Sequence, residues 1–359
     1  MTDTVRREVD PRRLHYLRVD PYLNELVGMR SLATALELGL IDALARGPLQ
    51  EADLPGCEDF EPRGRGFLLD LLCAQGVIAR DGSQVVLAQG FRECLVFRDL
   101  IEAKISFAMF AVPDFLESLT HLLQGQAAFM PRSRTFELFR YDRCFDSSPE
   151  NLASTRRWVR ITTALTRYEA PILDDLLDWS DAHRVLDIGG NSGELLRSMT
   201  HRHPGLEGTV FDLPVVCQVG REYLQSHGLP GSVEFVAGDV RQDGSMTGFD
   251  RVIFKSFLHD WPASDVPWLL EKAFQALRPG GSLVIFERSP LVFHEALPGV
   301  PMIHSLVFLH CYHSREFYRE SLAHAGFIDI QVDRVDLEMP FHLIEAKRSI
   351  IPRPLREGS

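Results

Sequence analysis

Three aspartates follow buried strands of the sequence, and a glycine-rich turn follows the first of them. Asp187 lies within Val-Leu-Asp-Ile-Gly-Gly-Asn-Ser-Gly, at 185–193, which predicts a short buried strand, a tight turn and the start of a helix. Asp212 ends the next apolar run about 20 residues later, where a carboxylate can accept both hydroxyls of a ribose. Asp239 follows a third apolar run. The pattern indicates a nucleotide-binding edge of a sheet.

The acid before the turn indicates which nucleotide this edge would hold. A dinucleotide loop, G-x-G-x-x-G, brings bare backbone N–H groups against a pyrophosphate at a helix N-terminus. Here the glycines read G-G-x-x-G, and Asp187 precedes them, where it would repel a pyrophosphate. S-adenosylmethionine is a cationic sulfonium with a ribose, an adenine and no phosphate. The acids therefore favour S-adenosylmethionine over NAD, and the formal net charge of −12 also suits a cation.

Regular alternation of strands and helices would position these acids. Apolar runs predict strands, and segments with helical periodicity separate them. The predicted strands are 185–188, 207–211, 233–236, 249–255 and 282–287, and the last two segments, 328–335 and 342–346, read as a hairpin. This alternation predicts an α/β fold, a Rossmann-like, doubly wound and mainly parallel sheet with its ligand at the carboxyl ends of the strands.

The N-terminal part reads differently, as three helices and a short hairpin between residues 21 and 91. An Asp81-Gly82 turn joins the two strands of the hairpin, which predicts a winged-helix arrangement. No basic recognition face accompanies it, so dimerisation is favoured over DNA binding. We therefore expect a mostly helical winged-helix dimerisation domain at 1–100, a helical linker and substrate-pocket segment at 101–180, and a catalytic domain at 181–350.

Composition excludes several partners and suggests a compartment. The acidic net charge argues against nucleic acid or an anionic membrane as a partner. No apolar run reaches transmembrane length, and the N-terminus lacks the apolar core of a signal peptide. Six cysteines without a C-x-x-C or metal-finger spacing indicate reduced thiols and a cytoplasmic protein.

Aromatic residues are frequent in the helical segment before the sheet, beyond what a core of that size needs. The surplus could line an apolar pocket for a small-molecule acceptor. Met109, Phe129 and Trp158 are the expected pocket residues.

The strand-end motifs occur together in a known order. They are Val185–Gly193, Phe211-Asp212-Leu213-Pro214, Gly238-Asp239-Val240, Lys255, His259-Asp260-Trp261 and Leu277-Arg278-Pro279-Gly280-Gly281. In this order they resemble the S-adenosylmethionine-dependent class I O-methyltransferases of the plant caffeate and bacterial polyketide-tailoring type. The resemblance spans nearly the whole chain, since that family also carries an N-terminal winged-helix dimerisation domain, and it implies a homodimer.

The resemblance also implies roles for particular residues of the cofactor site. Gly189 and Gly193 would shape the loop under the methionine part, and Asp212 would hold the ribose. Asp239 and Val240 would flank the adenine, with Lys255 nearby. The chain departs from the family at Val240, where methionine is frequent, and at Asn191, where a third glycine is usual.

By the same resemblance His259 is the general base and Glu287 orients it, while Asp260 supports the site. An imidazole that titrates near neutrality suits this role, because methyl transfer requires the acceptor to present a lone pair. The chain departs from the family downstream, at 309–315, where a shorter loop lacks a second acid. His310 in this loop is a further pocket candidate.

Two alternatives remain open at this point. Further histidines follow His259, at His294, His304, His310 and His313. Two histidines and a carboxylate can form a facial metal site, so His259, Asp260 and His310 could assist C-methylation of a 2-oxo acid. The chain could also be a non-catalytic, cofactor-binding regulator. The favoured interpretation is a cytoplasmic, homodimeric methyltransferase of secondary metabolism that uses S-adenosylmethionine to methylate a hydroxyl of a small aromatic acceptor.

Overall fold

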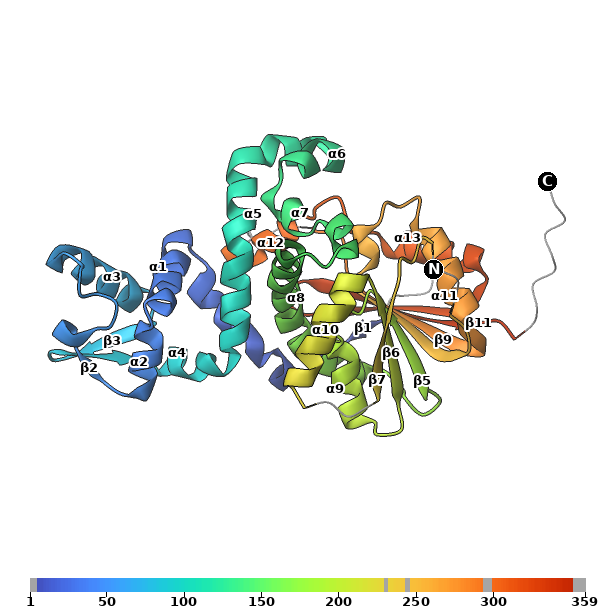
Figure 1. The fold of residues 1–359 in the computed structure, drawn as a ribbon, viewed down its shortest axis with the longest axis horizontal. Helices are drawn as coiled ribbons and strands as arrows, with labels where there is room; N and C mark the ends of the chain where they lie inside the picture. The colour runs from blue at the N-terminus through green and yellow to red at the C-terminus, as the bar shows by residue number, and fades with distance from the viewer. Residues whose placement is uncertain (1–4, 229–231, 243–245, 293–298, 351–359) are drawn as a thin grey trace.

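The computed structural model describes residues 5–228, 232–242, 246–292 and 299–350. A small N-terminal lobe and a larger α/β lobe lie on opposite sides of two long helices, α5 (Arg98–Gln124) and α8 (Pro149–Leu176) (Figure 1). Within the described residues, no helix has both the length and the apolar character needed to cross a membrane.

The small lobe has the predicted succession of three helices and a hairpin. Its elements are α1 (Leu26–Glu37), α2 (Leu40–Arg46), β2 (Leu49–Gln50), α3 (Pro62–Ala74), β3 (Ile78–Asp81), β4 (Gln84–Leu87) and α4 (Gln89–Cys94). Gly39 separates α1 from α2 with a φ of 71°, and Gly82 in the hairpin turn has a φ of 61°, conformations that glycine adopts without a steric penalty. The strands β2 and β3 flank β4 in a three-stranded sheet.

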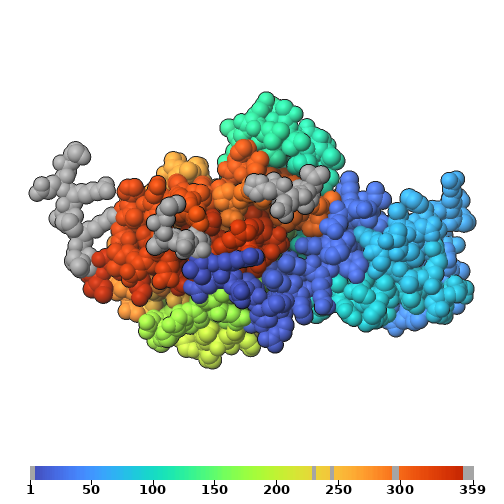
Figure 2. Space-filling view, turned by 180° about the vertical axis from the view of Figure 1, so that it is seen from behind, coloured from blue at the N-terminus to red at the C-terminus, as the bar shows by residue number. Residues whose placement is uncertain are grey.

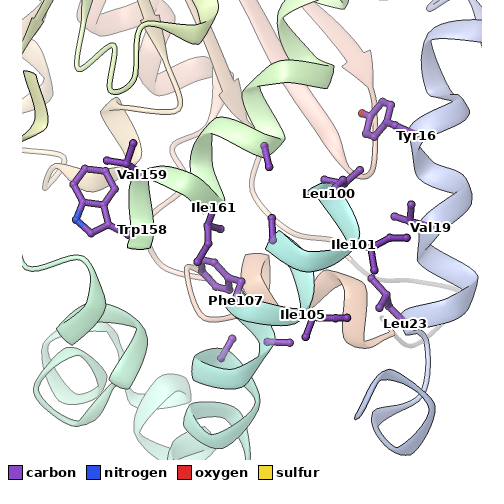
Figure 3. Close-up of a cluster of buried hydrophobic side chains, with 14 of the residues drawn as sticks. Tyr16, Val19, Leu23, Leu100, Ile101, Ile105, Phe107, Trp158, Val159 and Ile161 are labelled. Atoms are coloured by element: carbon purple, nitrogen blue, oxygen red, sulfur yellow. The ribbon is translucent and has the colours of Figure 1, made fainter. Parts of the chain in front are cut away.

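The long helices α5 and α8 tie the N-terminal chain to the α/β lobe. Pro149 occupies the first turn of α8, and the Ser148 side chain accepts a hydrogen bond from the Asn151 N–H at 3.3 Å, which caps the helix. Buried side chains of α5 contact the 3₁₀ helix η1 (Pro11–Leu23) on one side and α8 on the other (Figure 3). Shorter elements connect the two long helices: α6 (Gln126–Phe129), α7 (Arg134–Leu138) and the 3₁₀ helix η5 (Tyr141–Phe145).

The α/β lobe is built on one eight-stranded sheet with the strand order β1-β10-β11-β9-β8-β5-β6-β7. Its strands are β1 (Arg6–Arg7), β5 (Arg184–Ile188), β6 (Glu207–Asp212), β7 (Val233–Ala237), β8 (Phe249–Lys255), β9 (Leu277–Arg288), β10 (Phe327–Asp336) and β11 (Pro340–Arg348). Strands β5 to β9 pair in parallel, and β11 runs antiparallel to both of its neighbours. The predicted doubly wound, mainly parallel sheet and its closing hairpin are confirmed.

Helices cover both faces of the sheet, and successive residues of a strand point alternately to one helix layer and to the other. Val185 belongs to the core shared with α8, α9 (Glu194–Arg202) and α10 (Pro214–Ser226), whereas Leu186 belongs to the core under α11 (Val266–Ala276) and α13 (Arg315–Ala325). Both faces of the sheet are therefore covered, as a parallel sheet requires. The strand order reverses at β5, which lies between β6 and β8, so a crevice opens beyond the carboxyl ends of these strands.

The N-terminal segment also contacts the sheet. Arg6 and Arg7 of β1 pair in parallel with Arg334 and Val335 of β10, and Arg7 Nε lies 2.5 Å from Asp333 Oδ2. Figure 2 shows this segment, in dark blue, against the red C-terminal part of the chain.

Candidate active site

A cavity of about 410 Å³ lies at the carboxyl ends of the central strands. It is lined by residues at or just beyond the carboxyl ends of β5, β6, β7 and β8, and by Trp158, Thr162 and Thr166 of α8. Its lining includes seven of the expected site residues: Trp158, Gly189, Asp212, Asp239, Val240, Lys255 and Asp260. The cavity thus lies in the crevice where the strand order reverses, and the strand-end motifs of the sequence meet there.

The turn after β5 depends on glycine. Gly189 has a φ of 73°, and a Cβ at this position would lie 2.1 Å from Cδ2 of the Phe257 ring. Gly193, at the start of α9, has a φ of 76°. Asn191 also adopts a left-handed conformation, with a φ of 58°, which asparagine tolerates better than most residues. The turn therefore keeps its left-handed shape although asparagine replaces the third glycine.

The two acids nearest this turn are buried. Asp187 does not line the cavity. Its carboxylate lies directly beneath the turn, since a Cβ added to Gly190 would be only 2.6 Å from Asp187 Oδ2. Burial raises the pKa of Asp187 to about 7, against an opposing effect of the Lys255 charge. Burial also raises the pKa of Asp212 to about 6, although its carboxylate accepts hydrogen bonds from the N–H groups of Asn191 and Leu213 at 2.8 and 2.7 Å. A cation bound here would stabilise both carboxylates.

Asp239 and Lys255 have internal partners in the same cavity. Asp239 accepts hydrogen bonds from the backbone N–H and the Nε of Arg241, at 3.0 and 2.9 Å. Burial acts to raise the pKa of Asp239, but these hydrogen bonds outweigh it and lower the pKa. Lys255 Nζ donates to Thr166 Oγ1 at 2.9 Å and forms an ion pair with Glu169 of α8. Sequence reasoning missed Glu169, because a glutamate in a helix gives no local sign of a partner far along the chain.

His259 and Glu287 form a hydrogen-bonded pair beside the cavity. The distance from His259 Nδ1 to Glu287 Oε2 is 2.8 Å, and Glu287 Oε1 accepts the backbone N–H groups of Phe257 and Leu258, each at 2.6 Å. The Glu287 carboxylate, which is fully buried, can only accept, so Nδ1 carries the proton and Nε2 is left with the lone pair. Burial acts to lower the pKa of His259, but the charges of Glu287 and Asp260 outweigh it and raise the pKa.

Asp260 lies on the other side of the imidazole. Its Oδ1 is 3.7 Å from His259 Nε2, and its Oδ2 accepts a hydrogen bond from the Tyr141 hydroxyl at 2.8 Å. Burial raises the pKa of Asp260, and the His259 charge and the Tyr141 hydrogen bond oppose this rise. Tyr141 was not among the expected site residues, and no motif surrounds it in the sequence.

Aromatic rings form a wall next to His259, and Phe308 is at its centre. The Phe308 ring centroid lies 5.8 Å from that of His259, 5.3 Å from Phe136 and 6.3 Å from Phe139. Trp158 lines the cavity, as expected of a pocket residue, and contacts Phe139 at a centroid distance of 5.9 Å. The wall thus joins the surroundings of His259 to the cavity.

Two other expected pocket residues lie elsewhere. Met109 is 46% exposed and lines a separate hollow between α1, α3 and α5. It is two positions from the buried Phe107, which places the two side chains on different faces of α5. Phe129 is buried behind Phe136, at a centroid distance of 6.1 Å, and does not line the cavity.

The described histidines after His259 do not assemble into a metal site. His310 Nε2 lies 2.6 Å from the backbone carbonyl of Leu122, to which it must donate, so this nitrogen has no lone pair for a metal or an acceptor. His313 Nε2 lies 3.2 Å from the carbonyl of Trp261. Over the described part of the chain, no three His, Cys, Asp or Glu side chains are grouped as metal ligands. His294 lies outside the described residues.

Tyr312, rather than His310, is the residue of this loop that contacts the imidazole, at a centroid distance of 5.8 Å from His259. His310 does not line the strand-end cavity, and its Nε2 contacts the carbonyl of Leu122, near the carboxyl-terminal end of α5.

The sequence of the chain is similar to those of known methyltransferases. Residues 148–307 match a family model described as an O-methyltransferase domain. The chain is 30% identical over 322 residues to N,N-dimethyltransferase OxyT of Streptomyces rimosus, covering 86% of this chain and 89% of that protein. It is 27% identical to the mitomycin biosynthesis 6-O-methyltransferase of Streptomyces lavendulae, covering 72% of this chain and 73% of that protein.

The fold also matches solved structures. The structure of human N-acetylserotonin methyltransferase in complex with S-adenosylmethionine aligns with a TM-score of 0.67, at 20% sequence identity, over 95% of this chain and 99% of that one. The strand-end cavity, with its acids and its glycine turn, fits the cofactor of such enzymes. The chain therefore belongs to the S-adenosylmethionine-dependent O-methyltransferase family and is an enzyme that transfers methyl groups from this cofactor.

Proposed function

We propose that the enzyme methylates a hydroxyl of a small aromatic acceptor and that His259 is its general base. The hydrogen bond between His259 and Glu287 is the observation that carries this proposal. It fixes the tautomer in which Nε2 can accept a proton, beside a wall of aromatic rings suited to a planar acceptor.

The proposed roles follow from the hydrogen-bonding capacity of each group. The acceptor hydroxyl donates to His259 Nε2 and passes its proton there as the oxygen attacks. Glu287 holds the Nδ1 proton and stabilises the imidazolium that forms. Asp260, held by Tyr141, adds negative charge beside the same ring. The cofactor, when bound, supplies an electrophilic methyl group on its sulfonium.

The cofactor roles of the remaining residues are part of the same proposal. Gly189 and Gly193 shape the loop, Asp212 holds the ribose, and Asp239 and Val240 flank the adenine. Asp187 lies beneath the turn, where a bound cation would favour its ionised form. Two observations support the assignments: Gly189, Asp212, Asp239 and Val240 line one cavity, and Gly193 lies where the same turn leads into α9.

The acceptor class is proposed from the aromatic wall and from relatives. One relative is a 3-hydroxy-5-methyl-1-naphthoate 3-O-methyltransferase and another a mitomycin biosynthesis 6-O-methyltransferase, whereas OxyT carries the name of an N,N-dimethyltransferase. We therefore expect a fused-ring acceptor of secondary metabolism that carries a free hydroxyl.

The acceptor atom is tested with matched naphthalene compounds and methyl-labelled S-adenosylmethionine. A hydroxynaphthoate should take up label as a methyl ether, and its methoxy counterpart should not. Label transferred instead to the matching aminonaphthoate, or to a ring carbon of the methoxy compound, would contradict O-methylation. Mass spectrometry and proton NMR of the product identify the methylated atom.

We also propose that the enzyme is a homodimer and acts in the cytoplasm. An apolar surface extends over α1, α3 and the outer face of α5, where Val27, Phe67, Leu116 and Leu123 are 58%, 62%, 70% and 67% exposed. Exposed apolar surfaces of this kind mark interfaces. Six free cysteines are consistent with a reducing compartment.

Sedimentation equilibrium tests the dimer. Wild-type protein should have twice the mass of the 40.6 kDa chain, and Phe67→Glu should shift it towards the single-chain mass, because a charge would be buried at the interface. Ile328→Glu, at an exposed apolar residue of β10, is the matched control and should leave the mass unchanged. A single-chain mass for wild type would refute the proposal.

A further inference from the structure

Two cationic side chains line the cofactor cavity among the described residues, and each is paired with a carboxylate. Arg241 Nε lies 2.9 Å from Asp239 Oδ1. Lys255 Nζ is paired with Glu169 Oε2. Three further aspartates also line the cavity: Asp212, Asp260 and Asp265. Because each pair is neutral overall, the three further aspartates leave the cavity with a net negative charge, which favours a cationic ligand.

Glu169 holds the more deeply buried of the two cations. The side chains of Glu169 and Lys255 are 2% and 8% exposed, whereas that of Arg241 is 57% exposed. Glu169 Oε1 also accepts a hydrogen bond from Arg288 Nη2 at 2.7 Å, and Arg288 is paired in turn with Glu338 at 2.7 Å. Burial acts to raise the pKa of Glu169, but the charges of Lys255 and Arg288 outweigh it and lower the pKa to about 2. Glu169 is therefore a fixed negative charge within the protein.

The reaction changes the charge of the ligand in this cavity. S-adenosylmethionine carries a positive sulfonium, and its product S-adenosylhomocysteine has a neutral thioether in almost the same shape. An unpaired Lys255 would repel the first ligand more than the second. Water screens charge–charge interactions only weakly at a buried site. The carboxylate that neutralises Lys255 should therefore strengthen binding of S-adenosylmethionine more than binding of S-adenosylhomocysteine.

We propose that Glu169, acting through Lys255, determines how strongly the enzyme prefers S-adenosylmethionine to S-adenosylhomocysteine. Glu169 does not line the cavity. It therefore acts on the ligand indirectly, by neutralising the charge of Lys255, which does. The preference supports turnover, because the product loses the electrostatic attraction that held the cofactor. The inference rests on the family's cofactor and is independent of the acceptor and of His259.

Binding measurements without any acceptor test this inference. The dissociation constants of S-adenosylmethionine and S-adenosylhomocysteine are measured by isothermal titration calorimetry for each variant. Glu169→Gln keeps the shape of the side chain and should reduce the preference for S-adenosylmethionine by a factor of about 10, the order of magnitude expected when one unit charge is lost near a ligand in a protein interior. A merely structural role would weaken both ligands equally.

Three further variants sharpen the test. Lys255→Met removes the cation and should change the preference in the opposite direction, so it decides the question even if Glu169→Gln folds poorly. The double variant Glu169→Gln/Lys255→Met should return the preference to within about twofold of that of wild type. Glu338→Gln is the matched control, since it perturbs Arg288 without touching Lys255, and should leave the preference unchanged. Equal weakening of both ligands by Glu169→Gln, or no opposite change in Lys255→Met, would overturn the proposal.

Discussion

His259→Ala is expected to lower kcat by a factor of about 10² to 10⁴, the usual contribution of a positioned general base. The imidazole supplies an Nε2 lone pair that is oriented by a buried carboxylate, and alanine leaves the acceptor hydroxyl without this proton acceptor. S-adenosylmethionine binding should change little, because His259 does not line the cofactor cavity. Steady-state kinetics and calorimetry measure the two effects separately.

The matched control for this substitution is His313→Ala. His313 lies in the downstream loop and contacts the Trp261 carbonyl, so its loss should affect kcat far less. Turnover retained in His259→Ala, or an equal loss in both variants, would remove the assignment of His259 as the base.

Gly189→Ala is expected to weaken S-adenosylmethionine binding by a factor of at least about 10. A left-handed alanine costs roughly 1–2 kcal/mol, and a tenfold change corresponds to about 1.4 kcal/mol. The added methyl group would also lie 2.1 Å from the Phe257 ring. Because the Phe257 N–H binds Glu287, displacement of this residue should lower kcat as well.

Gly205→Ala provides the control for this second substitution. A Cβ at Gly205 would meet no atom within 4 Å, so cofactor affinity and kcat should match those of wild type. Calorimetric titration with S-adenosylmethionine compares the two variants. Wild-type affinity in Gly189→Ala would show that the turn tolerates a side chain and does not form the cofactor loop as proposed.

The parts of the site that could be predicted are those set by strand periodicity. Residues at the ends of neighbouring parallel strands must meet at one edge of the sheet, so the strand pattern predicts that Asp212 and Asp239 lie around one cavity, and the family resemblance adds Lys255 to them. The pairing of His259 with Glu287 was implied by the family resemblance, and the structure brings these residues together because β8 and β9 are neighbours.

The residues that were missed or misplaced depend on packing between distant segments. Tyr141 meets Asp260, and Glu169 meets Arg288, each across 119 positions of the chain. Nothing local to η5 or α8 reveals these partners. The same holds for His310, whose partner is the Leu122 carbonyl of α5. The surplus of aromatic residues indicates a pocket without showing which face of α5 would line it, and Met109 lines a separate hollow.

The pH dependence of kcat/KM for wild type and Glu287→Gln tests the central claim most directly. The acceptor should have a hydroxyl with a pKa of about 10, as in a simple phenol, so that it does not titrate in the same range. A general base acts in its unprotonated form, so the wild-type rate should rise with pH through the raised pKa of His259.

Glu287→Gln removes the main charge that raises this pKa, so the account predicts that the rise moves to lower pH while the maximal rate falls. An unchanged midpoint in Glu287→Gln, or a rate that does not depend on pH in wild type, would contradict the account of His259 and Glu287 as a base and its orienting carboxylate.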